Sequence, residues 1–222
     1  MTGRWRARAS ARSLGLGVAA LLVAALAAAP ARPEPLTLNG ITFSDELGGF
    51  VLLEGSGSGT PDDPFVIVER ITSDAPAVLV IRGLSIAFDN PLGSNHFVGF
   101  ALTKVVINAT QRVWRSFALG LQPKLGEDST YFDGLSFGQD DTTVRTLASD
   151  LYSDVVVIDE PLDGMRFRDG AVRPGERAMF RFVITHNAPK SEFFLVQQRE
   201  QHIVLGPGRG APAAPLVRDG PG

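Results

Sequence analysis

The segment MFRFVI, residues 179–184, decides the fold class of this 222-residue chain. Its apolar residues Phe180, Phe182 and Ile184 recur with a period of two, the spacing that places side chains on one face of a β-strand. The segment FALGL, residues 117–121, repeats the pattern. A strand of this kind buries one face and leaves the other at least partly in water. The two segments therefore predict an antiparallel sheet.

Other segments are apolar at every position and suit strands in the middle of a two-layer stack. They are FVIV at residues 65–68, AVLVI at residues 77–81 and VVVI at residues 155–158. Four more strands are expected at Gly49 to Glu54, Phe97 to Asn108, Met165 to Arg168 and Glu192 to Gln198. With about nine or ten short strands between turn residues, the sequence predicts an all-β chain forming a single antiparallel β-sandwich, Ig-like or jelly-roll-like.

One short helix is the most that the pattern allows. In the segment Asp141 to Leu151, the apolar residues Val144, Leu147 and Leu151 would share a helical face behind residues that cap helices well. We expect it to be at most a short connection between strands.

The first 31 residues read as a signal peptide. Arg4, Arg6, Arg8 and Arg12 give a basic start, and an apolar run from Leu14 to Ala28 follows. This run is shorter than the roughly 20 residues of a membrane span, although a retained membrane anchor is the alternative. Small residues suited to signal peptidase stand either just after this run, at 29–31, or near its end, at 25–27. We therefore expect export by the general secretory route to a periplasm or to the cell exterior, with no stable membrane insertion after cleavage.

The remaining residues limit the classes of function. Without the four arginines of the first 31 residues, the chain has 17 basic and 24 acidic residues, a net charge of −7, which disfavours a nucleic-acid partner. It has no cysteine, which excludes thiolate catalysis, iron–sulfur clusters and cysteine-bound zinc. We expect one β-sandwich domain over residues 36–205. A disordered tail rich in glycine, proline and alanine should follow over residues 206–222.

The segment EGSGSGTPDDPF, residues 54–65, offers glycines and acids in one loop. Because a strand pattern follows it, the loop lacks the helix that a nucleotide-binding glycine loop requires. Asp62 and Asp63 are candidate calcium ligands, but a calcium site needs more oxygen ligands than this loop supplies. Two sets of acids could complete it: Asp133, Asp140 and Asp141, or Asp154, Asp159, Glu160 and Asp163. No other cofactor is expected, and solvated loop acids are the simpler interpretation.

The segment GLSFG, residues 134–138, matches the G-x-S-x-G motif of serine hydrolases. Ser136 would be the nucleophile, followed in chain order by Asp154 or Asp159 and by His186 or His202. The motif needs a strand-to-helix turn, whereas the alternation here is typical of a strand. We therefore expect no catalytic residue here and keep the hydrolase as an alternative.

Trp114 is the only tryptophan outside the first 31 residues. The sequence favours a role in the core beside Phe117 and Leu119, because large aromatic residues dominate such cores. The alternative is a carbohydrate-binding role, with the Trp114 ring stacked on a sugar.

Several segments together resemble exported bacterial β-sandwich proteins of unknown function. They are VVINATQRVWRSFALGL (105–121), DGLSF (133–137), FRDGAVRPGERAMFRFVI (167–184) and FFLVQQ (193–198). The resemblance covers about Ile41 to Ile203 and implies a sandwich fold, and it carries no catalytic residues that could be transferred to this chain. From the export signal, the β pattern and the missing structural context of each catalytic motif, we expect an exported, non-catalytic protein with a structural, adhesive or envelope-associated binding role, whose partner is an envelope component, a glycan or a protein. A calcium-stabilised or carbohydrate-binding surface module is the alternative.

Overall fold

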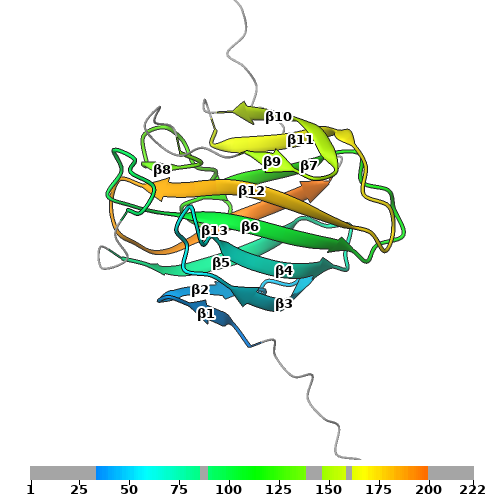
Figure 1. Ribbon diagram of the computed structural model, residues 1–222, viewed down its shortest axis with the longest axis horizontal. Helices are drawn as coiled ribbons and strands as arrows, with labels where there is room; N and C mark the ends of the chain where they lie inside the picture. Colours follow the sequence, from blue (N-terminus) through cyan, green and yellow to red (C-terminus); the bar gives the residue numbers. More distant parts are fainter. Residues whose placement is uncertain (1–33, 86–89, 139–146, 159–161, 200–222) are drawn as a thin grey trace, which may run out of the picture. The chain divides into compact units, whose positions relative to one another are not determined.

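The computed structural model describes residues 34–85, 90–138, 147–158 and 162–199 (Figure 1). The expected signal peptide, residues 1–31, and the expected tail, residues 206–222, lie outside these ranges. The described residues form 13 strands in two sheets and no helix. None of them therefore belongs to a helix that could cross a membrane.

The first sheet has seven strands in the order β1-β2-β5-β13-β7-β11-β10. They are β1 (Leu36–Leu38), β2 (Ile41–Ser44), β5 (Ala77–Leu84), β13 (Lys190–Arg199), β7 (Phe117–Gln122), β11 (Gly164–Gly170) and β10 (Tyr152–Ile158). The second sheet has the order β3-β4-β6-β12-β8, and β9 also pairs with β12. Its strands are β3 (Phe50–Ser56), β4 (Phe65–Ile71), β6 (Val98–Asn108), β12 (Arg177–His186), β8 (Leu135–Ser136) and β9 (Ala148–Ser149).

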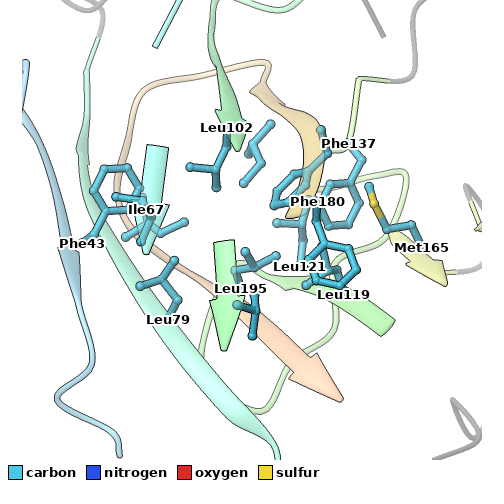
Figure 2. Close-up of a cluster of buried hydrophobic side chains, with 14 of the residues drawn as sticks. Phe43, Ile67, Leu79, Leu102, Leu119, Leu121, Phe137, Met165, Phe180 and Leu195 are labelled. Carbon is cyan, nitrogen blue, oxygen red and sulfur yellow. The ribbon is translucent and has the colours of Figure 1, made fainter. Parts of the chain in front are cut away.

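The two sheets pack face to face, an arrangement consistent with a β-sandwich. The ring of Phe117 in β7 stacks on that of Phe180 in β12, with centroids 4.4 Å apart. At another place in the core, the centroids of Phe43 in β2 and Phe65 in β4 are 5.4 Å apart. Figure 2 shows this interior, where leucine, isoleucine and phenylalanine side chains from both sheets meet.

The segment MFRFVI lies in β12 and alternates as expected, with one exception. Phe180, Phe182 and Ile184 are buried in the core and Arg181 is exposed. Val183 faces away from the core and is nevertheless buried, because it forms a small second cluster with Leu92 and Ala101.

Three expectations need correction. The described residues alone form 13 strands rather than nine or ten, because short strands such as β1, β2 and β9 were not foreseen. Residues 147–151 are not helical: Ala148–Ser149 pair with β12, and the rest of the expected helix lies outside the described residues. The sandwich is not wholly antiparallel, since β4 and β6 pair in parallel. They can do so because the strand between them in the chain, β5, belongs to the other sheet.

Candidate functional site

Ser136 and His186 do not approach each other as a hydrolase would require. Ser136 lies in β8 opposite Thr185, whereas His186 lies opposite Leu135. Neighbouring residues of a strand point to opposite faces, so the side chains of Ser136 and His186 leave the sheet on different sides. The Ser136 hydroxyl is buried and has no hydrogen-bond partner among the described residues. The other hydrolase candidates Asp159 and His202 lie outside the described residues.

Among the described residues, the acids proposed for calcium do not form a metal-binding group, although two of them, Asp133 and Asp163, both contact the Ser129 hydroxyl. Asp62 and Asp63 are exposed in a loop whose backbone closes on itself, with Ser58 N and Gly59 N donating to Asp63 O. Asp154 pairs with Arg168, and Asp140, Asp141, Asp159 and Glu160 lie outside the described residues. Across the part of the chain that the structure describes, no three histidine, aspartate or glutamate side chains converge in a group that could hold a metal ion.

Trp114 is part of the core, with 2% of its surface exposed. Its Nε1 donates to Thr110 Oγ1 at 3.2 Å, and the guanidinium of Arg199 lies 5.4 Å from the ring centroid. The ring therefore offers no free face to a sugar in this conformation. The core role that the sequence favoured is the one that the structure has.

The most exposed large apolar side chains lie at one end of the second sheet. Phe132 is 92% exposed, Phe97 66% and Tyr131 58%. Val98 and Leu135 both pair with His186, so the segments that carry these three aromatic residues enter the sheet at the same end. We call Phe97, Tyr131 and Phe132 the aromatic tip. Exposed apolar side chains that gather in one region of the surface are candidates for an interaction site.

A tight turn holds Tyr131 and Phe132 in place. Asp133 N donates to Thr130 O at 3.1 Å. The Asp133 carboxylate accepts hydrogen bonds from the backbone NH groups of Thr130 (2.8 Å) and Leu135 (2.9 Å). Asp133, a calcium candidate in the sequence, thus stabilises this turn, as aspartate commonly does.

A buried serine connects the turn to the rest of the sandwich. The hydroxyl of Ser129 lies within 3.0 Å of Asp133 Oδ1, Leu135 O and Asp163 Oδ2, and it can donate to one of them at a time. The backbone NH of Ser129 donates to Leu121 O, and Ser129 O accepts from Asp163 N. These hydrogen bonds connect the turn to β7 and to the segment before β11. The backbone that carries the two exposed rings is therefore fixed to the sandwich.

His186 is buried beneath this end of the sheet. Its Nδ1 accepts a hydrogen bond from the backbone NH of Ala188 at 2.9 Å, and its Nε2 has no partner among the described residues. Burial lowers the pKa of His186 to about 4, and the positive charge of Lys190 acts in the same direction against the attraction of Asp133. His186 is therefore neutral at pH 7, with its proton on Nε2.

The outer face of the second sheet has a shallow hollow of about 560 Å³. Val66, Val105 and Met179 line it together with Arg181, and Pro61 and Pro64 of the acidic loop form part of its wall. The loop that raised the calcium hypothesis therefore serves as one side of an apolar depression.

Comparisons of the chain with protein-family models, with curated proteins and with solved structures found no match. The function is therefore argued from the described residues.

Sequence reasoning did not single out Tyr131 and Phe132. Adjacent aromatic residues usually belong to a core, and only their position between turn-forming residues, in DSTYFDG (128–134), distinguishes them. That signal indicates a turn but does not show which way the rings point.

Proposed function

We propose that this chain is an exported, non-catalytic β-sandwich protein with an adhesive or envelope-associated binding role, and that the aromatic tip is its contact site. The observation that carries the proposal is Phe132, which is 92% exposed on a turn held by hydrogen bonds. Burying such a ring in a partner contributes about 1.5–3 kcal/mol. Because the turn is already ordered, little of this is spent on fixing the loop.

The partner that fits the tip best is a protein with an apolar pocket. The rings of Tyr131 and Phe132 are perpendicular, with centroids 5.7 Å apart, and together they form a wedge. A wedge enters a pocket, as aromatic anchors do in protein interfaces. The acidic balance of the chain beyond residue 31 argues against a nucleic acid or an anionic lipid surface.

A carbohydrate partner is the second candidate. Tyr131 combines an exposed ring with a hydroxyl group, a pairing suited to stacking on a sugar and to hydrogen bonding. The calcium-stabilised module has less support, since the described acids form no metal-binding group.

The cellular location of the protein and the type of sandwich belong to the same proposal. The basic and apolar character of residues 1–31 supports the general secretory route, and a periplasmic or extracellular location would follow. Two packed sheets with connections that cross between them support an Ig-like or jelly-roll-like sandwich.

A photocrosslinking amino acid at position 132 tests the binding proposal in cells that export the protein. We expect protein-sized adducts at position 132 and none at position 53, where Leu53 is 39% exposed on β3 and serves as the control. Adducts that resist protease but yield to glycan-degrading enzymes would favour the carbohydrate candidate. Equal adducts at both positions, or none at position 132, would contradict a contact site at the tip.

The hydrolase alternative has a direct test. We expect the purified protein not to cleave simple aryl esters. Cleavage that is lost in Ser136→Ala, but kept in a control such as Ser153→Ala, would overturn the non-catalytic proposal.

A further inference from the structure

Three fully buried polar side chains meet in the interior, among the apolar side chains of the core. Glu69 belongs to β4 and Lys104 to β6 of the second sheet, and Gln197 belongs to β13 of the first. All three residues are 0% exposed. Since β6 and β13 lie in the interior of their sheets, this group lies where the two layers face each other.

The three side chains meet at one oxygen atom. Lys104 Nζ lies 2.6 Å from Glu69 Oε2, and Gln197 Nε2 donates to the same oxygen at 3.2 Å. Glu69 Oε2 thus contacts both the amine of Lys104 and the carboxamide of Gln197, which brings these two groups into the same small region of the interior.

Within the described part of the chain, this arrangement leaves two buried oxygen atoms without a hydrogen-bond donor. Glu69 Oε1 and Gln197 Oε1 are buried and have no partner among the described residues. An unpaired buried acceptor costs about 1–3 kcal/mol, and a buried ion pair is seldom stabilising by itself. The group is thus poorly explained as a device for stability alone.

The same arrangement suits an amide-forming reaction. An amine attacks a carbonyl carbon only in its neutral form, and burial lowers the pKa of Lys104. Glu69 is placed to take a proton from Lys104 Nζ and to give one to Gln197 Nε2, because its Oε2 contacts both nitrogens.

We propose that Lys104 and Gln197 become joined by an intramolecular amide bond between Nζ and Cδ, with Glu69 transferring the protons and ammonia leaving. This cross-link goes beyond the binding role proposed above and does not depend on it.

The reaction balances without an oxidant or cofactor. Glu69 takes one proton from the Lys104 ammonium, and the free electron pair of Nζ attacks Cδ of Gln197, moving the carbonyl electron pair onto Oε1. As the carbonyl re-forms, Nε2 takes the proton held by Glu69 and leaves as ammonia, and Glu69 receives a proton from Nζ. The products are a secondary amide, a neutral Glu69 and one ammonia molecule, so the buried charge pair is eliminated.

The cross-link would connect the two sheets covalently. Disulfides do this in many exported sandwiches, and this chain has no cysteine. Residues 104 and 197 are far apart in sequence, so the bond would close about half of the domain into one loop.

The test is the mass of the purified, denatured wild-type protein, with its mature N-terminus determined separately. We expect a mass lower than that of the sequence by one ammonia molecule, and a proteolytic fragment that contains both Lys104 and Gln197 linked together. A mass equal to that of the sequence would overturn the proposal. Loss of one water, with Lys104 bound to Glu69, would overturn the assignment to Gln197.

Variants and controls make the test specific. Lys104→Met, Gln197→Met and Glu69→Gln should each have the full sequence mass. Lys124→Met and Gln198→Met, which alter an exposed lysine and the neighbour of Gln197, should keep the loss of ammonia. Asn39–Gly40 can also lose ammonia by forming a cyclic imide, so a loss that maps to these residues would count against the cross-link. The fragment map of the wild type decides the matter even if a core variant fails to fold.

Discussion

Phenylalanine has opposite energetic roles at positions 180 and 132. Phe180 is fully buried and contacts the rings of Phe117, Tyr152 and Phe167. Phe180→Ala removes these contacts and leaves a cavity, so we expect the free energy of unfolding to fall by about 3–5 kcal/mol. Phe132→Ala removes an exposed ring and should change it by less than about 0.5 kcal/mol. Denaturant unfolding of both variants checks this, and equal losses would contradict the placement of Phe132.

A second prediction at this scale concerns acid stability and His186. The folded pKa of about 4 lies below the value of about 6.5 expected in the unfolded chain. Between these values the unfolded chain binds more protons, so the free energy of unfolding should fall as the pH drops from about 6.5 to about 4. The loss attributable to His186 is at most about 3–4 kcal/mol.

His186→Asn isolates this contribution, because asparagine can still accept the Ala188 hydrogen bond and does not titrate. We expect its stability to depend less steeply on pH between 4 and 6.5 than that of the wild type, as measured by denaturant unfolding at several pH values. If the stability of the wild type and of His186→Asn changed equally with pH, His186 would not titrate as its burial indicates.

Among the connecting elements, the loop before β4 depends on a glycine. Gly57 has φ +91°, and a Cβ atom there would lie 2.0 Å from Pro64 O. Gly126 has φ +85° with open space around it, so it provides a matched control. We expect Gly126→Ala to cost about 1–2 kcal/mol from the backbone conformation alone, and Gly57→Ala to cost clearly more. Thermal unfolding of the two variants measures the difference, and equal shifts would show that the loop yields to the added methyl group.

The elements that the sequence predicted well are those with a clear period. MFRFVI and FALGL lie in strands whose core-facing residues are those that the alternation selects. Short pairings such as β9 could not be predicted, because two residues carry no period and their pairing depends on β12. The direction of β4 relative to β6 could not be predicted either, since it depends on β5 crossing to the other sheet.

The candidate sites were harder to predict than the strands. Ser136 and His186 follow a hydrolase order in the sequence, and only the pairing register shows that they lie on opposite faces. The group of Glu69, Lys104 and Gln197 carries no local signal, because its members come from three strands in two sheets. In the sequence, Lys104 reads as one polar residue in a long strand.

For the whole molecule, the absence of a metal-binding group among the described acids has a thermal consequence. We expect the melting temperature to stay unchanged when a calcium chelator is added, because a ligand bound only to the folded state would raise it and its removal would lower it. Scanning calorimetry with and without chelator, and with added calcium, measures this. A lower melting temperature with chelator would restore the calcium-stabilised alternative.

The proposed cross-link determines how the whole domain behaves when it unfolds. Joining residues 104 and 197 closes a loop on the order of 100 residues, and such a loop contributes about 4–5 kcal/mol by restricting the unfolded chain. Gln197→Met removes the carboxamide and leaves the contact between Lys104 and Glu69 in place, so we expect it to lose roughly this amount in denaturant unfolding.

The denatured wild type should also be more compact than Gln197→Met and migrate faster in SDS gels. Reductant should not change this difference, because the chain has no cysteine. Gln198→Met, one residue further along β13, should migrate with the wild type. Identical mobility of wild type and Gln197→Met would mean that the two layers are held together by packing alone.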